Sequence, residues 1–285
     1  MISISLALTA AFLFALGAQF SRLGLQHASS AQGALIQITV SAILFWLFSP
    51  FFIETYFWLA PVALLFAAMG VFRPFLSSRL AMAGNKRLGP TITSTMAGIS
   101  PLFGVALGVL ALGETLTTNI FIGATGIFCG VTLLSWRDRN IPRGWPLWAL
   151  LLPLAAAFIR AVTNLFAKLG MESLASPYFV SLVGTTVATA VAFSVTRRSL
   201  DMALLKNGGA RWFIMTGTCY ALAMLALNTA LSQGRLVAIA PILACAPLFS
   251  LFLGFTVFGE RTINLRAVVA VAIIVPSVVA ITLSH

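Results

Sequence analysis

Apolar segments of about 20 residues follow one another along almost the whole chain, separated by short breaks rich in glycine, proline or charged residues. A helix that crosses the hydrocarbon core of a bilayer needs about 20 mainly apolar residues. We predict ten such helices, over residues 2–22, 30–51, 56–82, 89–112, 117–136, 146–168, 177–196, 211–232, 236–258 and 263–283. The pattern therefore predicts an all-α integral membrane protein.

The two halves of the chain repeat each other at an offset of 146 residues. PLFGVALGVLALGE (101–114) and PLFSLFLGFTVFGE (247–260) share seven of fourteen residues, and 6–24 shares nine of nineteen with 152–170. Because each half has an odd number of helices, the second unit enters the membrane from the opposite side. We predict two inverted five-helix repeats joined by a cytoplasmic linker: residues 1–136, linker 137–145, and residues 146–285.

Composition supports lipid as the main solvent, because 60% of the residues are apolar and only 8% are charged. A net charge of +11 would suggest nucleic acid in a soluble protein. Here the basic residues lie mostly between the apolar segments, where they act as topology signals, so no nucleic-acid partner is expected. The three cysteines lie singly in apolar segments and form neither a disulfide framework nor a metal-ligand pattern. We expect no metal and no cofactor.

Charge also predicts orientation. The loops after the odd-numbered helices carry almost all basic residues, whereas the opposite side has only Lys168 and Arg235. The first set consists of Arg22, Lys86, Arg87, Arg137, Arg139, Arg143, Arg197, Arg198, Lys206, Arg211 and Arg261. By the positive-inside rule this side faces the cytoplasm, which places both termini outside.

Each half contains a proline before a glycine-rich helix that ends in Gly-Glu and is followed by a last apolar helix. In this arrangement the whole chain resembles the drug/metabolite transporter superfamily, in its ten-helix EamA-type branch. The resemblance implies a transporter without catalytic residues. It also implies a cavity lined by the first, third, fourth, sixth, eighth and ninth helices. Many members are drawn with cytoplasmic termini, and the charges here predict the opposite.

Glu114 and Glu260 close the repeated motif, each just before the next helix. A carboxylate there can accept hydrogen bonds from free backbone N–H groups at the positive end of the helix dipole. We predict that both are helix caps, with a gating or coupling role as the alternative.

Four prolines are predicted to bend helices. Pro101 and Pro247 of the motif lie inside predicted helices, where each frees the carbonyl four residues earlier, and Pro241 adds a bend to the ninth helix. Pro74 lies in the third helix, directly after Arg73. Bends can serve packing alone, or they can expose backbone groups to a substrate near the bilayer centre.

No acidic residue is predicted at mid-membrane, since the six acids lie in loops or at helix ends: Glu54, Glu114, Asp138, Glu172, Asp201 and Glu260. This argues against cationic drug–proton antiport through a membrane-embedded glutamate. The interior is basic instead. Arg73 lies near the middle of the third helix, and Arg160 lies eight residues before Lys168, about 12 Å deep. A buried arginine is costly unless it meets water, a partner or a ligand, so an anionic substrate group is one predicted partner and snorkelling to the interface is the alternative.

Polar residues near these arginines are candidate substrate contacts. Asn164 lies one helical turn from Arg160 on the same face. Gln19, Gln37, Tyr220 and Asn228 could orient a polar substrate or could form helix–helix hydrogen bonds.

Small-residue patterns at 104–108 and 126–130 predict close helix packing. The second pattern could also form a dimer contact. We expect a monomer, with a dimer as the alternative.

The sequence therefore predicts a transporter of the bacterial inner membrane that exports a small metabolite with an anionic group, such as an amino acid or organic acid, by alternating access. Its partners would be this substrate and membrane lipid. Alternatives are a multidrug transporter, a flippase for a lipid-linked group, and a structural or sensing membrane subunit. An integral membrane enzyme would need clustered reactive groups, and the two histidines, His27 and His285, lie far apart in the sequence.

Overall fold

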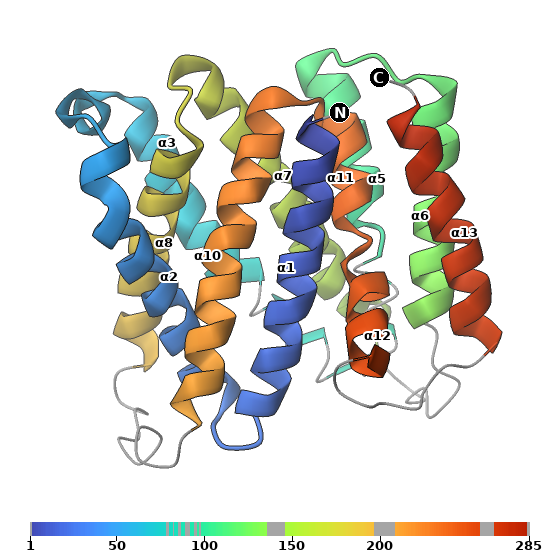
Figure 1. Ribbon diagram of the computed structural model, residues 1–285, viewed down its shortest axis with the longest axis horizontal. Coiled ribbons are helices and arrows are strands. Elements are labelled where there is room, and N and C mark those ends of the chain that lie inside the picture. Colours follow the sequence, from blue (N-terminus) through green and yellow to red (C-terminus); the bar gives the residue numbers. More distant parts are fainter. Residues whose placement is uncertain are drawn as a thin grey trace.

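A computed structural model describes residues 2–77, isolated positions between 80 and 96, and residues 98–135, 146–196, 209–256 and 265–283. In these residues all regular secondary structure is helical (Figure 1). The side chains of Pro74, Phe75, Ser135 and residues 265–267 are outside the description.

The helices follow the predicted apolar segments closely. The first half contains α1 (Ile2–Gly24), α2 (Ser30–Phe52), η1 (Thr55–Leu59), α3 (Val62–Gly70), the π-helical η2 (Val71–Leu76), α5 (Ser100–Leu112) and α6 (Thr118–Ser135). The second half contains η3 (Leu147–Leu150), α7 (Leu151–Ser173), α8 (Pro177–Thr196), α10 (Ala210–Gln233), α11 (Leu236–Leu243), α12 (Ala246–Thr256) and α13 (Leu265–Thr282).

Length and composition allow six described helical segments to cross a membrane, with η3–α7 and α11–α12 each counted as one. Four further apolar segments of 10–17 residues come from α3 with the start of η2, α5, α6 and α13. The count of ten spans stays a prediction. The start of α1 and the end of α13 lie at the same end of the molecule (Figure 1).

The two halves interleave. The most extensive helix pairings, such as α1 with α10, α6 with α13 and α2 with α10, each join one half to the other. Pairings occur in equivalent sets, because α3 packs on α7 as α10 packs on α1, and α5 packs on α7 as α12 packs on α1. Residues of both halves, among them Ile4, Phe66, Phe179 and Leu231, share one apolar core.

The glycines of α6 serve internal packing. A Cβ added at Gly130 would lie 2.5 Å from Cγ1 of Ile274, and one at Gly126 would lie 3.1 Å from Cβ of Ser277. Both neighbours belong to α13, which therefore covers the glycine face of α6. The pattern at 126–130 is thus explained without a dimer contact.

Among the described residues, the predicted helices 56–82 and 236–258, in which prolines were expected to cause bends, are interrupted. In the predicted helix 56–82, Arg73 has φ −130° and ψ 126°, which is extended backbone. Proline disfavours the helical region for the residue before it, so Pro74 accounts for this break. The predicted helix 236–258 stops at Leu243, turns through Ala244 and Cys245, and resumes as α12.

The prolines of the repeated motif begin helices and do not bend them, which corrects the prediction for both. Pro101 is the second residue of α5, and Pro247 is the second residue of α12. Proline is well tolerated there, because the first N–H groups of a helix have no intrahelical acceptor. Pro241 does lie inside α11, whereas Pro74 is described only by its backbone in η2.

Candidate functional site

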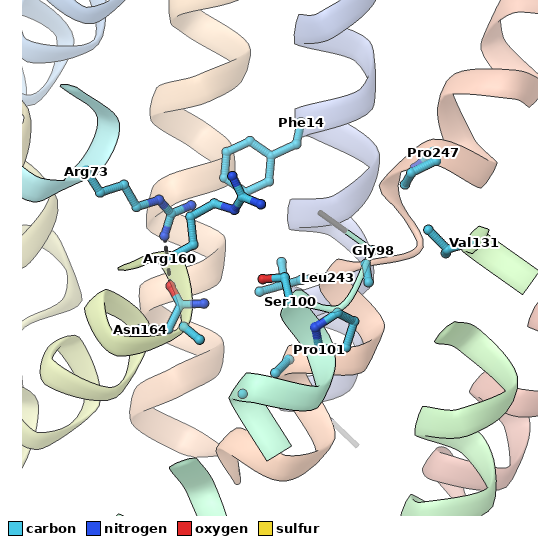
Figure 2. Close-up of a pocket in the computed structure, with 14 residues that line it drawn as sticks. Phe14, Arg73, Gly98, Ser100, Pro101, Val131, Arg160, Asn164, Leu243 and Pro247 are labelled. Carbon is cyan, nitrogen blue, oxygen red and sulfur yellow. Dashed lines mark hydrogen bonds between the residues drawn. The ribbon is translucent and has the colours of Figure 1, made fainter. Parts of the chain in front are cut away.

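A cavity of about 330 Å³ lies between the helix break at Arg73 in the first half and the α11–α12 junction in the second half (Figure 2). Its lining comes from α1, η2, α5, α6, α7 and the α11–α12 junction, and consists of Phe14, Arg73, Gly98, Ser100, Pro101, Gly104, Val131, Arg160, Ala161, Asn164, Ala240, Leu243, Ala244 and Pro247. A cavity of this size can hold a small molecule. Polar groups occupy only part of its wall, as is usual for such sites.

Equivalent backbone turns form part of this wall. The turn at Gly98 precedes α5, and the turn at Ala244, which lies 146 residues later, precedes α12. Pro101 and Pro247 are likewise equivalent and both line the cavity. Each turn therefore brings the N-terminus of a helix, the positive end of its dipole, to the cavity.

Two arginines line the cavity, one from each half. The Nη1 atom of Arg73 donates a hydrogen bond of 2.8 Å to Oδ1 of Asn164 (Figure 2). Arg160, on α7, has no hydrogen bond or ion pair to any described residue, although it interacts electrostatically with Arg73 and Tyr220. The described lining residues include no aspartate or glutamate. The cavity is therefore cationic, and its two like charges repel each other.

A second, smaller cavity of about 80 Å³ adjoins the first and shares Arg73 and Asn164 with it. Its lining, which comes mainly from α2, α3, α7, α8 and α10, also contains Gln37, Ile38, Ser41, Met69, Gly70, Thr163, Ala167, Val180, Gly184, Thr185, Ala188, Tyr220, Met224 and Asn228. Three predicted candidates, Gln37, Tyr220 and Asn228, are thus brought together here.

These three candidates differ in their hydrogen bonding. Nδ2 of Asn228 donates to Oγ of Ser181 at 2.8 Å, which joins α10 to α8. The side chains of Gln37 and Tyr220 form no hydrogen bond to described residues, and the ring of Tyr220 packs edge-on against Phe14 with centroids 5.1 Å apart. Gln37 and Tyr220 therefore keep polar groups available in the second cavity.

Gln19 lies apart from both cavities. Its Nε2 atom donates to the carbonyl oxygen and to Oγ of Ser250, both at 2.8 Å. This arrangement matches the helix–helix alternative, since it ties α1 to α12.

Glu114 caps a different helix from the predicted one. Its Oε1 and Oε2 atoms accept hydrogen bonds from the backbone N–H groups of Leu236 and Val237, each at 2.8 Å. These residues begin α11 in the other half, whereas the sequence argument placed the cap on the following helix, α6. The equivalent Glu260 lies outside the described residues.

The polar lining residues that were not predicted are all hydroxyl residues: Ser41, Ser100, Thr163 and Thr185. Ser41, Thr163 and Thr185 each donate to the carbonyl oxygen four residues earlier in their own helix. Serine and threonine do this commonly in membrane helices, so their presence carries no functional signal in a sequence. Among the described residues, no group of three or more His, Cys, Asp or Glu side chains could hold a metal ion.

The sequence model of the EamA-like transporter family matches this chain twice, over residues 1–136 and 147–283. The chain belongs to this family. It is thus a multi-pass membrane protein of the drug/metabolite transporter superfamily, and the resemblance found in the sequence is confirmed. Members of the family are transporters rather than enzymes.

The other comparisons concern the fold. No curated protein matches this EamA-like transporter by sequence. One crystal structure superposes on it with a TM-score of 0.82 at 16% identity, over 99% of this chain and 96% of that chain. Identity this low shows a shared fold and nothing about the substrate.

Proposed function

We propose that this EamA-like transporter exports a small metabolite with an anionic group, such as an amino acid or organic acid, across the bacterial inner membrane. The observation that carries the proposal is the Arg160 guanidinium, which lines the cavity without a hydrogen-bond partner among the described residues. Among the described residues, Arg73 beside it is hydrogen-bonded only to the neutral amide of Asn164. An anion would supply the charge that these two side chains lack.

The energetic argument favours a ligand of this sign. Arginine within a membrane-spanning helix costs several kcal/mol unless its charge is compensated. An anion between the guanidinium groups would relieve the repulsion between Arg73 and Arg160 and would lie near the N-termini of α5 and α12. A cationic substrate would add a third positive charge to the same site.

The proposed mechanism is alternating access. Ten membrane spans in two inverted repeats, with both termini extracytoplasmic, would place the cavity between two units that rock around it. Arg73 belongs to the first repeat and Arg160 to the second. A substrate that binds both side chains would therefore contact both moving units.

The test is transport by purified protein in liposomes, with a panel of labelled amino acids and organic anions beside cationic dyes. We expect flux of one or more anionic or zwitterionic compounds. Arg160→Gln should lower that flux by at least about tenfold, since hydrogen bonds to charged groups contribute about 1.5–3 kcal/mol. Arg211→Gln, which removes an arginine that lies over the Trp212 ring at 4.9 Å, is the matched control. Movement of cationic dyes without any anion flux would reject the proposal.

A second candidate, the transport of lipid-linked or other amphiphilic compounds, is favoured by one observation. An apolar groove of about 510 Å³ on α1, α12 and α13 is lined by Phe12, Leu248, Phe249, Leu251, Phe252, Phe255, Val268 and Val271. Such a groove could hold an acyl chain beside the α11–α12 junction. Transfer of fluorescent lipid analogues between leaflets of the same liposomes would favour this candidate.

A further inference from the structure

Glu114 is the centre of a polar cluster that connects the two halves. Its side chain is only 8% exposed, and its carboxylate accepts two backbone hydrogen bonds from the start of α11. Nζ of Lys168, on α7, forms an ion pair with Oε1 of Glu114 at 3.0 Å. One carboxylate of the first half therefore binds two separate elements of the second half.

Two further hydrogen bonds extend the cluster. Nζ of Lys168 also donates to the carbonyl oxygen of Gly234, and Nη2 of Arg235 donates to the carbonyl oxygen of Thr115 at 2.8 Å. Gly234 and Arg235 form the α10–α11 connection, and Thr115 lies in the α5–α6 connection. The Arg235–Thr115 bond joins the loops of the two halves, whereas the Lys168–Gly234 bond lies within the second half and holds Lys168 beside the start of α11.

The local backbone conformation positions the Glu114 side chain for its contacts with the second half. Gly113 adopts the left-handed conformation with φ +63°, which ends α5 and turns the chain back. The N–H of Glu114 then donates to the carbonyl oxygen of Gly108 at 3.0 Å. Only glycine adopts this conformation without strain, which gives the Gly-Glu pair of the repeated motif a physical reason.

The cluster lies at one end of the cavity. Gly104 and Ala240, from α5 and α11, meet in the cavity wall. One helical turn further along α5, a Cβ added at Gly108 would lie 2.7 Å from Cγ1 of Val237 and 3.0 Å from Oε2 of Glu114. The α5–α11 contact that borders the cavity therefore ends at the Glu114 cluster.

We propose that Glu114, Lys168 and the N-terminus of α11 form a gate between the halves, which must open in each transport cycle. This inference rests on the alternating access of the proposed function. A cap within one half would need no change when the halves rock. The contacts of Glu114 with Lys168 and with the start of α11 all cross between the halves, so movement of α5 away from α11 must break them.

The sequence repeat supplies a similar pair for the other half. Arg22 is the equivalent of Lys168, and Glu260 is the equivalent of Glu114. Inversion of the repeat would place that pair toward the opposite membrane face. Glu260 lies outside the described residues, so the gate proposed here is the one at Glu114.

The test measures access to the cavity from each side of the membrane. A single cysteine replaces the cavity residue Ser100 in a background with Cys129, Cys219 and Cys245 changed to alanine. It is then labelled with a membrane-impermeant maleimide in right-side-out and inverted vesicles. Glu114→Gln and Lys168→Gln are compared with Glu172→Gln, which removes an exposed acid at the end of α7. Lys168→Gln keeps both hydrogen bonds from α11 to Glu114, so it should fold even if Glu114→Gln does not.

We expect both gate variants to raise labelling from the membrane side on which Glu114 lies by about tenfold, because this change corresponds to the loss of one hydrogen bond to a charged group. Glu172→Gln should leave the labelling unchanged. Equal labelling of Lys168→Gln and its parent from both sides would overturn the gate. Labelling needs no substrate, so this failure would leave the anionic substrate assignment standing. Altered labelling together with absent anion flux would instead retain the gate and reject that assignment.

Discussion

In the proposed anion site, Asn164 occupies the position at Arg73 that a substrate oxygen would take. Its Oδ1 atom lies 2.8 Å from Nη1 of Arg73, a distance suited to a carboxylate oxygen as well. We therefore expect Asn164→Asp to form an internal ion pair that competes with an anionic substrate. The KM for anion transport should rise by about tenfold to a hundredfold, the equivalent of a charged hydrogen bond. Initial rates in proteoliposomes over a range of substrate concentrations would measure it.

Asn164→Leu is the control for this substitution, because it removes the hydrogen bond to Arg73 without adding a charge. It should lower anion transport less than Asn164→Asp does. If Asn164→Asp transports anions with an unchanged KM, Arg73 does not bind the substrate.

The sequence identified the charged residues of the site better than the neutral ones. Arg73 and Arg160 were predictable because a charge inside an apolar segment is rare and costly. Gln19 and Gln37 looked equivalent in the sequence, yet one binds Ser250 and the other lines a cavity. An amide side chain is satisfied equally well by a helix or by a ligand, so only the packing of distant segments distinguishes the two cases.

Among the helices, α5 and α12 define the cavity by where they begin. Helix interruptions were harder to predict than helices, because proline is compatible both with a bend and with a first turn. The turns at Gly98 and Ala244 decide between these possibilities, and neither residue signals a turn by itself. Glu114 shows the same limit, since its helix partner is more than a hundred residues away in the sequence.

Removal of Pro247 should make α11 and α12 more continuous. Its ring prevents a helical hydrogen bond to the carbonyl of Leu243, and proline is disfavoured inside helices by about 3 kcal/mol relative to alanine. Pro247→Ala should therefore lower transport while the protein stays folded, as checked by flux and by gel filtration. Pro276→Ala changes a proline inside α13, which does not line the cavity, and should transport normally. Equal flux in the two variants would show that the break has no role in transport.

The contact between α6 and α13 should tolerate no added methyl group. A Cβ at Gly123 would lie 2.6 Å from the carbonyl oxygen of Ser277 and 2.4 Å from Cγ1 of Ile281. Overpacking of this kind typically costs about 1–3 kcal/mol, so Gly123→Ala should lower the thermal unfolding midpoint in detergent. Gly184→Ala is the matched control, because a Cβ there meets nothing within 4 Å. A midpoint that falls equally in both variants would contradict the packing argument.

For the whole molecule, the charge distribution predicts an orientation that can be measured directly. With both termini extracytoplasmic, a C-terminal alkaline phosphatase fusion in bacteria should be active, and a C-terminal green fluorescent protein fusion should be dark. The start of α1 and the end of α13 lie at one end of the structure, so both termini must give the same answer. A fluorescent C-terminal fusion would place the basic loops outside and reverse the assignment.

The interleaving of the halves has a consequence for biogenesis. Helix α1 is complete at Gly24, whereas α10, along which it packs, begins only at Ala210. Membrane helices insert first and associate afterwards, so α1 must remain in lipid while most of the chain is synthesised. Its alanine-rich face tolerates this, but the amide of Gln19 can form the hydrogen bonds of the folded structure only after Ser250 has entered the bilayer. The residue that finally ties α1 to α12 is therefore the one that leaves α1 most open to mispairing during synthesis.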